Sequence, residues 1–440
     1  MLGGDEIAYF CASSSTDMDF IEELEWRGML HDSTPGIKEY LSGGMRQGYI
    51  GFDPTAPSLT IGNYVQLMIL SFWQQSGHQP IFLLGGATGR IGDPSGKDKE
   101  RQLKSAEELD ANLLHQKEQA AKFLNFTDGP SKAIMVNNYD FYKEMNILDF
   151  LRDVGKNLTV NYMMSKDSVK NRLETGLSFT EFSYQLLQAN DFLCLYNRYD
   201  CRVQMGGSDQ WGNITSGTEF IRRNVEGGKA YAITTPLLAK ADGKKFGKSE
   251  EGNIWLDPKL TSPYKFYQFW INADDADLPK FFRYFSFKNR EEIEELEQST
   301  DPRSLKKILA EELTIRIHGE KDFKAVKDVS EILFNKNASQ EMLMSLSQMS
   351  LETIGQEIPC FEIEKALVSN HVSIADLLAD HTSICKSKGD VKRAVQNNAL
   401  SVNKVKISDP THMITGDDLL HGSHIMIENG KKNKFLINLK

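Results

Sequence analysis

The 440-residue sequence predicts an α/β protein in which a mostly parallel sheet is covered by helices on both faces. Short buried strands alternate with longer helical stretches up to about residue 260, which is the pattern of a parallel sheet. Turns rich in glycine or aspartate follow three of these strands, and the alternating pattern ends near residue 262. We therefore expect one sheet-containing domain, followed by parts of different architecture.

The first expected element is an amphipathic helix over 19–29, whose apolar residues recur at helical spacing. A buried strand over 48–53 ends before Pro54 and Pro57, and a helix over about 59–75 follows. Because parallel strands share one carboxyl edge, the turns after them should meet there, where such sheets bind ligands. The later strands are expected at 81–84, 133–136 and 202–205, and the later helices at 105–125, 147–155 and 179–196.

The chain divides into segments of different pattern. The first 17 residues contain Asp5, Glu6 and Asp17 but no Lys or Arg, unlike a signal peptide or a mitochondrial presequence, so we expect a disordered extension. Helical periodicity with proline breaks extends from residue 262 to about 350, and the pattern changes again near residue 360. The predicted boundaries are 1–17, 18–261, 262–350 and 361–440.

Charge is unevenly distributed along the chain. With 51 Lys and Arg against 61 Asp and Glu, the net charge of −10 argues against a protein coated with basic surface for nucleic acid. Residues 361–440, however, hold 11 basic and 9 acidic residues, and within 384–406 six basic residues face only Asp390. A local basic patch in this segment could therefore contact RNA or another anion.

The five cysteines are scattered and form no CxxC pair, which argues against a disulfide framework or a zinc ribbon and fits a reducing compartment. No apolar run approaches 18 residues, so we expect no membrane span.

Two glycine-rich segments invite a phosphate-binding interpretation. Residues 85–97, GGATGRIGDPSGK, contain GxxGxxG instead of the dinucleotide pattern GxGxxG, and their Gly-Lys pair is followed by Asp98. Residues 243–249, GKKFGKS, have three residues between the glycines where a P-loop has four. The glycine spacing therefore excludes a P-loop NTPase, while a lysine-rich surface loop remains an alternative for the second segment.

Taken in series, the motifs GFDPT (51–55), TIGN (60–63), GGATGRIGDPSGK (85–97), GGSDQWGN (206–213) and KFGKS (245–249) resemble the class I aminoacyl-tRNA synthetases. They are most similar to the bacterial-type tyrosyl-tRNA synthetases, and the resemblance covers nearly the whole chain from about Met18. TIGN stands where the family has HIGH, and KFGKS where it has KMSKS. We call these two stretches the first and second signature segments.

The resemblance implies a Rossmann-like catalytic domain over 18–261 with a helical dimer-interface insertion, an α-helical anticodon-binding domain, and a small α+β RNA-binding domain of ribosomal-protein type. It also implies two reaction steps, in which ATP activates tyrosine to tyrosyl-adenylate and the tyrosyl group then moves to the 3′ end of tRNA. The expected enzyme is a cytoplasmic homodimer that uses ATP with Mg²⁺ and binds tRNA. We expect no tightly bound cofactor, protein metal site, DNA or membrane partner.

A carboxylate is already a competent nucleophile, so activation needs alignment and stabilisation of phosphate charge, with no general base. The resemblance implies that Lys248 lies in a mobile loop over the pyrophosphate. The candidate catalytic residues are Thr55, Thr60, Asn63, Lys97, Arg101, Lys245, Lys248 and Ser249. The candidate ATP-binding residues are Gly51, Asp53, Gly62, Gly207, Asp209, Gln210 and again Lys248.

Tyr184, Gln188 and Asp191 lie at i, i+4 and i+7, which places three polar groups on one helix face. From spacing alone, a partner-facing stripe remains an alternative. By resemblance, Tyr184, Gln188 and Asp93 hold the ammonium of tyrosine, while Asp191 and Tyr49 reach its phenolic hydroxyl and Gln204 supports the pocket. Buried groups of this kind reject phenylalanine, and no editing domain is expected.

The first signature segment departs from the family at the first histidine of HIGH, which is Thr60 here, and Asn63 replaces the last. Threonine is shorter and cannot carry charge. We expect activity to survive through Thr55, Lys245 and Lys248, with slower adenylate formation.

Residues 387–395 resemble the family's small RNA-binding domain, and Lys388, Lys392 and Arg393 could share a helix and meet phosphates. A solvated basic face is the alternative for this patch. For the whole chain, a tryptophanyl synthetase is the near rival, but Asp191 with Tyr49 favours a phenolic substrate. A third hypothesis is an RNA-binding scaffold with an inactive synthetase core, and Thr60 is the only feature that favours it.

Overall fold

The structure is a computed structural model that describes residues 18–95, 102–173, 176–243, 246–249, 252–299, 301–335, 337–430 and 433–440, without the side chains of Leu173, Lys248 and Ser249. The expected extension over 1–17 lies outside these residues. The chain forms two compact units, one of Met1–Thr261 with Phe269–Ile317 and one of Ser262–Gln268 with His318–Lys440. Each unit is described by itself.

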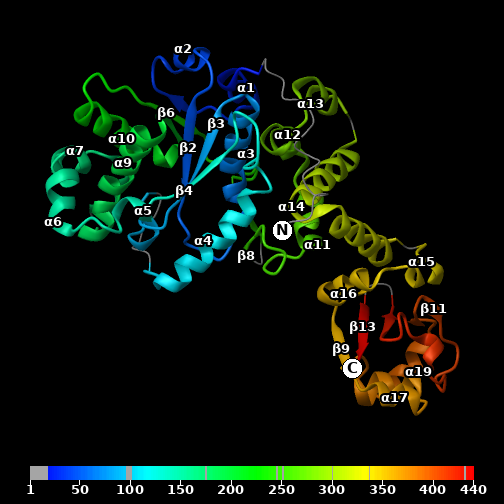
Figure 1. The fold of residues 1–440 in the computed structure, drawn as a ribbon. Helices are drawn as coiled ribbons and strands as arrows, with labels where there is room; N and C mark the ends of the chain where they lie inside the picture. Colours follow the sequence, from blue (N-terminus) through cyan, green and yellow to red (C-terminus); the bar gives the residue numbers. More distant parts are fainter. Residues whose placement is uncertain are drawn as a thin grey trace. The chain divides into compact units, whose positions relative to one another are not determined.

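A six-stranded sheet forms the centre of the first unit (Figure 1). The strands stand in the order β1-β6-β5-β2-β3-β4, and all neighbours are parallel except β1 and β6. This confirms the predicted mostly parallel sheet. The strands are β1 (Asp32–Ser33), β2 (Gln47–Phe52), β3 (Gln79–Leu84), β4 (Ile134–Asn137), β5 (Cys201–Gly207) and β6 (Tyr231–Thr235).

Helices cover both faces of this sheet, as Figure 1 shows for α9 and α10 on one side and α3 on the other. Strand residues alternate between the faces, so Tyr49 and Ile81 pack with Phe192 of α9, whereas Phe52 and Phe82 stack on each other in the opposite layer. The helices from the N-terminus to α10 are α1 (Phe20–Arg27), α2 (Ile37–Ser42), α3 (Ile61–Gln75), α4 (Ala106–Ala120), α5 (Tyr139–Tyr142), α6 (Ile147–Asp149) with a π-helix (Phe150–Gly155), α7 (Val160–Met164), α8 (Asp167–Leu173), α9 (Phe179–Tyr199) and α10 (Trp211–Asn224).

Every strand and helix predicted for this unit is present within a few residues of its expected ends. The edge strand β1 has only two residues, too few to show a period, and was not expected.

The helical stretch predicted over 262–350 is divided between the two compact units, since Ser262–Gln268 and the residues from His318 onward belong to the second unit. Residues Phe269–Ile317 belong with the sheet-containing unit, and the division falls next to Gly319, where α14 is non-helical at φ 86° and ψ 163°. The helices here are α11 (Pro263–Ile271), α12 (Leu278–Phe285), α13 (Arg290–Glu297) and α14 (Pro302–Phe334).

The second unit contains a five-stranded sheet in the order β11-β10-β12-β13-β9. Its core is aliphatic and includes Val391 of α19 and Ile425 of β12, both fully buried. The elements are α15 (Gln340–Met344), α16 (Gln348–Glu357), β9 (Cys360–Ile363), α17 (Lys365–Ser369), α18 (Ile374–Asp376) with a π-helix (Leu377–His381), α19 (Lys388–Gln396), β10 (Leu400–Val402), β11 (Val405–Lys406), β12 (His424–Asn429) and β13 (Asn433–Leu439). Among the helices of the described ranges, none is long and apolar enough to cross a bilayer.

Candidate active site

The sheet order creates a switch point between β2 and β5, because the chain proceeds from β2 to β3 and β4 on one side and returns to β5 and β6 on the other. Ligands of such sheets bind outside the carboxyl ends of the strands at this point. Asp53 directly follows β2, and Asp209 and Gln210 directly follow β5. The predicted site residues therefore meet at the edge that the topology favours.

Tyr49 of β2 and Gln204 of β5 are partners in neighbouring strands and are fully or almost fully buried. The hydroxyl of Tyr49 and the Oε1 atoms of Gln204 and Gln188 are buried without a hydrogen-bond partner among the described residues. Burying an unsatisfied polar atom costs about 1–3 kcal/mol. Three such atoms lie on β2, β5 and α9, where a polar ligand would satisfy them.

Asp191 of α9 is 1% exposed and accepts hydrogen bonds on both oxygens. Tyr142 donates its hydroxyl to Oδ1 at 2.7 Å, and Asn138 donates Nδ2 to Oδ2 at 2.8 Å. Burial raises the pKa of Asp191 to about 7, although both hydrogen bonds act in the opposite direction. This carboxyl group is therefore held in place and poised to accept a further donor.

Asp53 is the centre of a second set of hydrogen bonds. Tyr184 donates its hydroxyl to Asp53 Oδ2 at 2.8 Å, and Thr88 donates to Asp53 Oδ1 at 2.6 Å. Asn138 also donates to Thr88 Oγ1 at 3.0 Å, so the bonds run continuously from Asp53 to Asp191. A Cβ at Gly85 would lie 2.1 Å from Asp53 Oδ1, which explains the glycine there.

Asp93, in the turn after β3, is buried and fixed by side chains from β5's carboxyl end. Gln210 donates Nε2 to Asp93 Oδ2 at 2.7 Å, and Asn213 donates Nδ2 to Oδ1 at 3.3 Å. The backbone amide of Ser95 donates to Oδ1 at 2.9 Å. Gln210, a candidate ATP-binding residue, thus bonds Asp93 in this structure.

Thr60 of the first signature segment begins α3 as its N-cap. Its amide and its hydroxyl both donate to Oδ1 of Asn63 at 3.0 Å. The pair therefore stabilises the start of the helix, a structural role in which threonine is favoured. Asn63 keeps its Nδ2 donor outside this arrangement.

The second signature segment lies directly against the first. Gly247 has φ +89°, and a Cβ there would lie 3.3 Å from the amide nitrogen of Gly62. Ile254 donates its amide to Gly247 O, and Ile61 donates its amide to Ile254 O, so backbone bonds join the two stretches. Lys97, Arg101 and Lys245 lie outside the described residues, and only the backbone of Lys248 and Ser249 is described, in the two-residue strand β7 (Lys248–Ser249).

The remaining predicted nucleotide residues line the same edge. Gly51 and Gly62 are exposed, and a Cβ at Gly51 would meet only Leu83 at 3.9 Å. A Cβ at Gly207 would lie 2.6 Å from Asp209 Oδ1, so this glycine lets the Asp209 carboxylate lie against the backbone. Thr55 is half-buried and donates its amide to the carbonyl of Asp53 at 2.8 Å.

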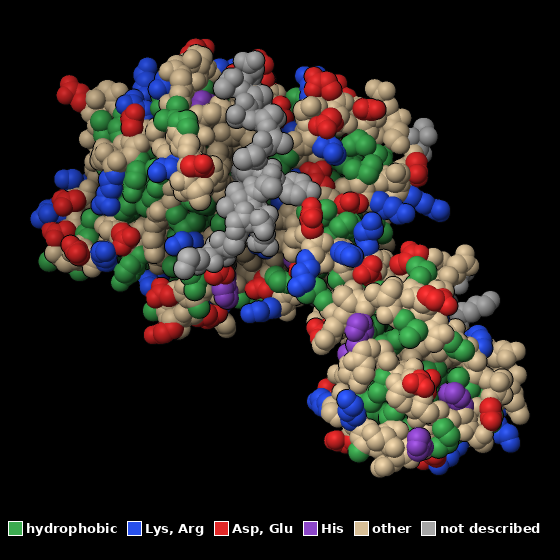
Figure 2. Space-filling view, turned by 45° about the vertical axis from the view of Figure 1, so that its right-hand side comes forward, with side chains coloured by type: hydrophobic (Ala, Val, Ile, Leu, Met, Phe, Trp, Pro, Cys, Tyr) green, Lys and Arg blue, Asp and Glu red, His purple; other side chains and the backbone are tan. Residues whose placement is uncertain are grey.

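Of the three predicted RNA-contacting residues, two are paired with carboxylates. All three lie on α19, but Lys388 bonds Asp376 and Asp380 while Arg393 bonds Asp390. Lys392 is exposed, and no ion pair is found for it within the described part of the chain. Figure 2 likewise shows Lys and Arg interspersed with Asp and Glu on the visible face of this C-terminal part.

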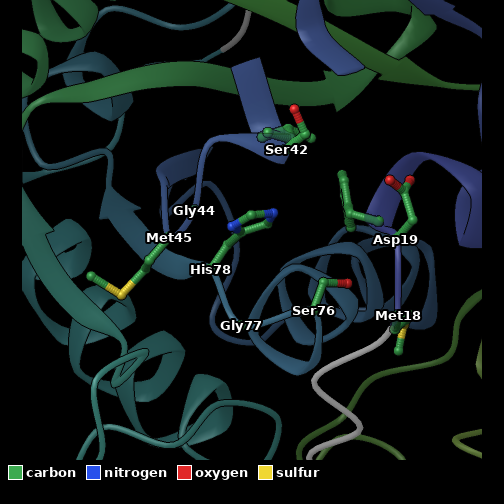
Figure 3. Close-up of a pocket in the computed structure, with 10 residues that line it drawn as sticks. Met18, Asp19, Ser42, Gly44, Met45, Ser76, Gly77 and His78 are labelled. Carbon is green, nitrogen blue, oxygen red and sulfur yellow. The ribbon is translucent and has the colours of Figure 1, made fainter. Parts of the chain in front are cut away.

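A separate hollow lies at the opposite edge of the first sheet and is unrelated to the predicted residues (Figure 3). Its lining includes His78, which directly precedes β3 and accepts a hydrogen bond from the amide of Arg46 at 3.3 Å. The ring of His78 lies 4.5 Å from that of Trp73, and burial lowers its pKa to about 4. These contacts account for His78 as a packing residue.

Sequence reasoning missed Thr88, Asn138 and Tyr142, which position Asp53 and Asp191. Asn138 had a usable signal, because it is a polar residue directly after the carboxyl end of β4. Tyr142 lies on the four-residue helix α5 and follows no motif, so no sequence signal pointed to it.

Comparison with known proteins agrees with this geometry. The family described as "tRNA synthetases class I (W and Y)" matches residues 45–335, and the "Tyrosine--tRNA ligase SYY-like C-terminal domain" family matches residues 350–437. A tyrosine–tRNA ligase of Cytophaga hutchinsonii is 51% identical over 95% of this chain and 99% of its own length. One of Porphyromonas gingivalis is also 51% identical, over 96% of this chain and 99% of its own length.

Solved structures of similar fold are also tyrosyl-tRNA synthetases. A C-terminally truncated mitochondrial tyrosyl-tRNA synthetase of Aspergillus nidulans is 31% identical with a TM-score of 0.64, covering 73% of this chain and 95% of its own. The tyrosyl-tRNA synthetase of Archaeoglobus fulgidus, at 17% identity and a TM-score of 0.51, shows the shared fold alone. The chain therefore belongs to the class I aminoacyl-tRNA ligases, in the family of the tyrosine–tRNA ligases.

Proposed function

We propose that this site joins L-tyrosine to ATP, forming tyrosyl-adenylate and pyrophosphate, and then transfers the tyrosyl group to the 3′ end of the tyrosine-specific tRNA. The observation that carries the proposal is the set of buried, unpartnered polar atoms on Tyr49, Gln188 and Gln204 beside the fixed carboxyl group of Asp191. A phenol with an ammonium group supplies donors and an acceptor for such a set.

In this proposal, the phenolic hydroxyl of tyrosine lies between Tyr49 and Asp191. The Asp191 carboxyl accepts its proton, and the Tyr49 hydroxyl bonds its oxygen. Gln188 and Asp93 meet the ammonium group together with Tyr184, whose hydroxyl already lies on Asp53. Gln204 supports Tyr49 from the adjacent strand. A phenylalanine side chain leaves the hydroxyl-binding groups unpaired, which is the basis of specificity.

ATP would lie across the carboxyl ends of β2 and β5, with Asp53, Asp209 and Gln210 at the ribose and Gly51, Gly62 and Gly207 against the nucleotide. The tyrosine carboxylate attacks the α-phosphate, so these residues align reactants and need not remove a proton. Thr55, Asn63 and the lysines Lys97, Lys245 and Lys248, with Arg101 and Ser249, stabilise the departing pyrophosphate.

We propose that Mg²⁺ enters with the ATP phosphates. Over the described ranges, no three His, Cys, Asp or Glu side chains are grouped so as to hold a metal ion. Mg²⁺ at such sites is usually bound by one or two carboxylates together with the phosphates of the substrate.

The division of labour between the units can be tested in one experiment. A variant with Lys388, Lys392 and Arg393 all replaced by Gln should keep tyrosine-dependent ATP–pyrophosphate exchange and lose charging of tRNA. Loss of both activities in a folded protein would refute the assignment of RNA binding to 361–440 and of activation to 18–261.

We further propose a homodimer formed through the segment between β4 and α9 together with the first residue of α9. This segment exposes large apolar side chains, although its inner side packs through Val154, Leu158 and Met163 on Leu186 of α9 and Phe220 of α10. Exposed apolar groups of this size mark interfaces in soluble proteins. The exposed residues are Ile147, Leu148, Leu151, Val160 and Phe179, at 67%, 73%, 46%, 59% and 73%.

We also propose a cytoplasmic location. The four described cysteines are free, in line with this proposal.

A further inference from the structure

Arg316 on α14 is almost completely buried, at 8% side-chain exposure, although its guanidinium carries a full charge. It donates Nη1 to the hydroxyl of Tyr64 at 2.9 Å and to the carbonyl of Phe285 at 2.5 Å, and it pairs with Glu312. The guanidinium also stacks 3.9 Å from the ring of Phe287. One side chain thus joins α3, α12 and α14.

The two residues that Arg316 joins are connected to the two signature segments. Tyr64 directly follows Asn63 in the first turn of α3 and is fully buried. Phe285 lies 5.2 Å from Tyr64 between ring centroids and stacks on Phe246 of the second signature segment at 5.4 Å and 22°. Phe285 therefore contacts the second segment directly and contacts the residue that follows the first segment.

Phe246 is 5% exposed and sits in an aromatic platform on α11 and α12. Its ring contacts those of Phe269 at 5.9 Å, Trp270 at 6.1 Å and Phe281 at 5.4 Å, in addition to Phe285. The next residue, Gly247, is the one that packs on Gly62. The platform consequently sets where the backbone before Lys248 lies relative to the start of α3.

We propose that Arg316 is a positioning residue for adenylate formation, because it fixes the aromatic platform under Phe246 to the first turn of α3 and so sets the spacing of the two signature segments. Groups on both segments must be aligned on ATP at the same time, and displacement by about 1 Å can cost up to about 100-fold in rate. The inference rests on the proposed assignment of these segments to ATP.

The chain contains a matched control in Arg27 of α1. Arg27 is also buried, at 2% side-chain exposure, pairs with Glu23 one turn away, and lies 4.2 Å from the ring of Phe72. It donates to the carbonyls of Arg283, Ser286 and Lys288. Arg27 thus holds the same region of α12 but contacts neither Tyr64 nor Phe285.

The experiment compares Arg316→Met with Arg27→Met. Single-turnover adenylate formation at saturating tyrosine and ATP is measured per folded enzyme, alongside tyrosine affinity by equilibrium dialysis. We expect Arg316→Met to lower the rate about 10- to 100-fold with tyrosine affinity within about twofold of wild type. Arg27→Met should keep the wild-type rate, and Arg316→Lys should recover part of the loss.

Two milder tests, one single variant and one pair of variants, keep the experiment decisive if Arg316→Met does not fold. Tyr64→Phe removes only the hydroxyl that Arg316 binds and should lower the same rate without weakening tyrosine binding. Gly247→Ala should lower it as well, whereas Gly243→Ala should not. Both glycines have positive φ, +89° and +77°, but a Cβ at Gly243 meets nothing within 4 Å.

Equal losses in the Arg316 and Arg27 variants, or in the two glycine variants, would overturn the proposal. A loss of tyrosine affinity that matches the loss of rate would overturn it too. If the wild type shows no tyrosine-dependent exchange, the proposed function itself fails. An active wild type with an unaffected Arg316→Met variant refutes only the positioning role.

Discussion

Asp191 combines burial, two donated hydrogen bonds and a pKa raised to about 7. Its ionised form is the better acceptor for a phenolic hydroxyl, so bound tyrosine should lower this pKa. Tyrosine affinity should therefore weaken as pH falls below 7, by at most about tenfold per pH unit. Equilibrium dialysis between pH 5.5 and 8.5 would show this slope.

Asp191→Asn serves as the control for that measurement, because its amide does not titrate. A tyrosine affinity that is flat with pH in the wild type would contradict the assignment. The effect of Asp191 titration on protein stability has the opposite sign to its effect on tyrosine affinity. Between pH 3.8 and about 7 the folded state holds the Asp191 proton more tightly than the unfolded state, so this group's contribution to stability is lost as pH rises.

Thr60 illustrates how one residue can serve structure and chemistry. Replacing it with histidine should raise the rate of pyrophosphate release in a pre-steady-state assay, because a longer, chargeable side chain can reach the leaving group. The same change removes the hydroxyl bond to Asn63 and should lower the free energy of unfolding by about 0.5–2 kcal/mol.

Denaturant unfolding would be measured on the same two proteins. A Thr60→His rate at or below the wild-type rate, in a folded enzyme, would mean that this position contributes capping and nothing to the leaving group.

At the scale of single elements, the three basic residues of α19 differ in whether they form an ion pair with a carboxylate. Lys392 has no carboxylate within reach in the described structure, whereas Lys388 and Arg393 must exchange an ion pair for a phosphate. Lys392→Ala should weaken tRNA binding most and reduce the slope of log affinity against log salt by about one. Filter binding at several salt concentrations tests this order, which a larger effect of Lys388→Ala would reverse.

The elements also show what sequence could predict. Strands and helices with clear periods, such as β2, β3 and α9, were expected near their observed positions, and so was the edge at which Asp53, Asp93 and Asp191 gather. The bonds from Asn138 and Tyr142 to Asp191 depend on how β4 and α5 sit beside α9, which no local pattern encodes. The contact of Gly247 with Gly62 likewise joins residues 185 positions apart. Only the resemblance to the synthetase family indicated that their two segments act together.

For the whole molecule, there is a physical reason why the helical stretch over 262–350 is divided between the two compact units. Helical periodicity marks secondary structure and not the partner against which a helix packs. Arg27 and Arg316 tie the region around α12 to α1 and α3, and α14 crosses from one unit to the other at Gly319. The assignment of anticodon recognition to 262–350 stays a prediction.

The proposed dimer is also a property of the whole molecule. Replacing both Leu148 and Phe179 with Asp places charges in the exposed apolar segment and should convert a dimer to a monomer in sedimentation velocity. Leu114→Asp, which changes a 57% exposed leucine on α4, should leave the assembly unchanged. An intact dimer in the double variant would exclude this segment as the interface.

The most direct test of the account compares tyrosine- and phenylalanine-dependent ATP–pyrophosphate exchange in the wild type and in Tyr49→Phe. The Tyr49 hydroxyl has no partner in the described structure, so its removal should not lower the free energy of unfolding. The wild type should prefer tyrosine by about 10⁵-fold, the value known for this family, and Tyr49→Phe should lose roughly tenfold or more of that preference. An unchanged preference, or a wild type with no tyrosine-dependent exchange, would contradict the proposed tyrosine site.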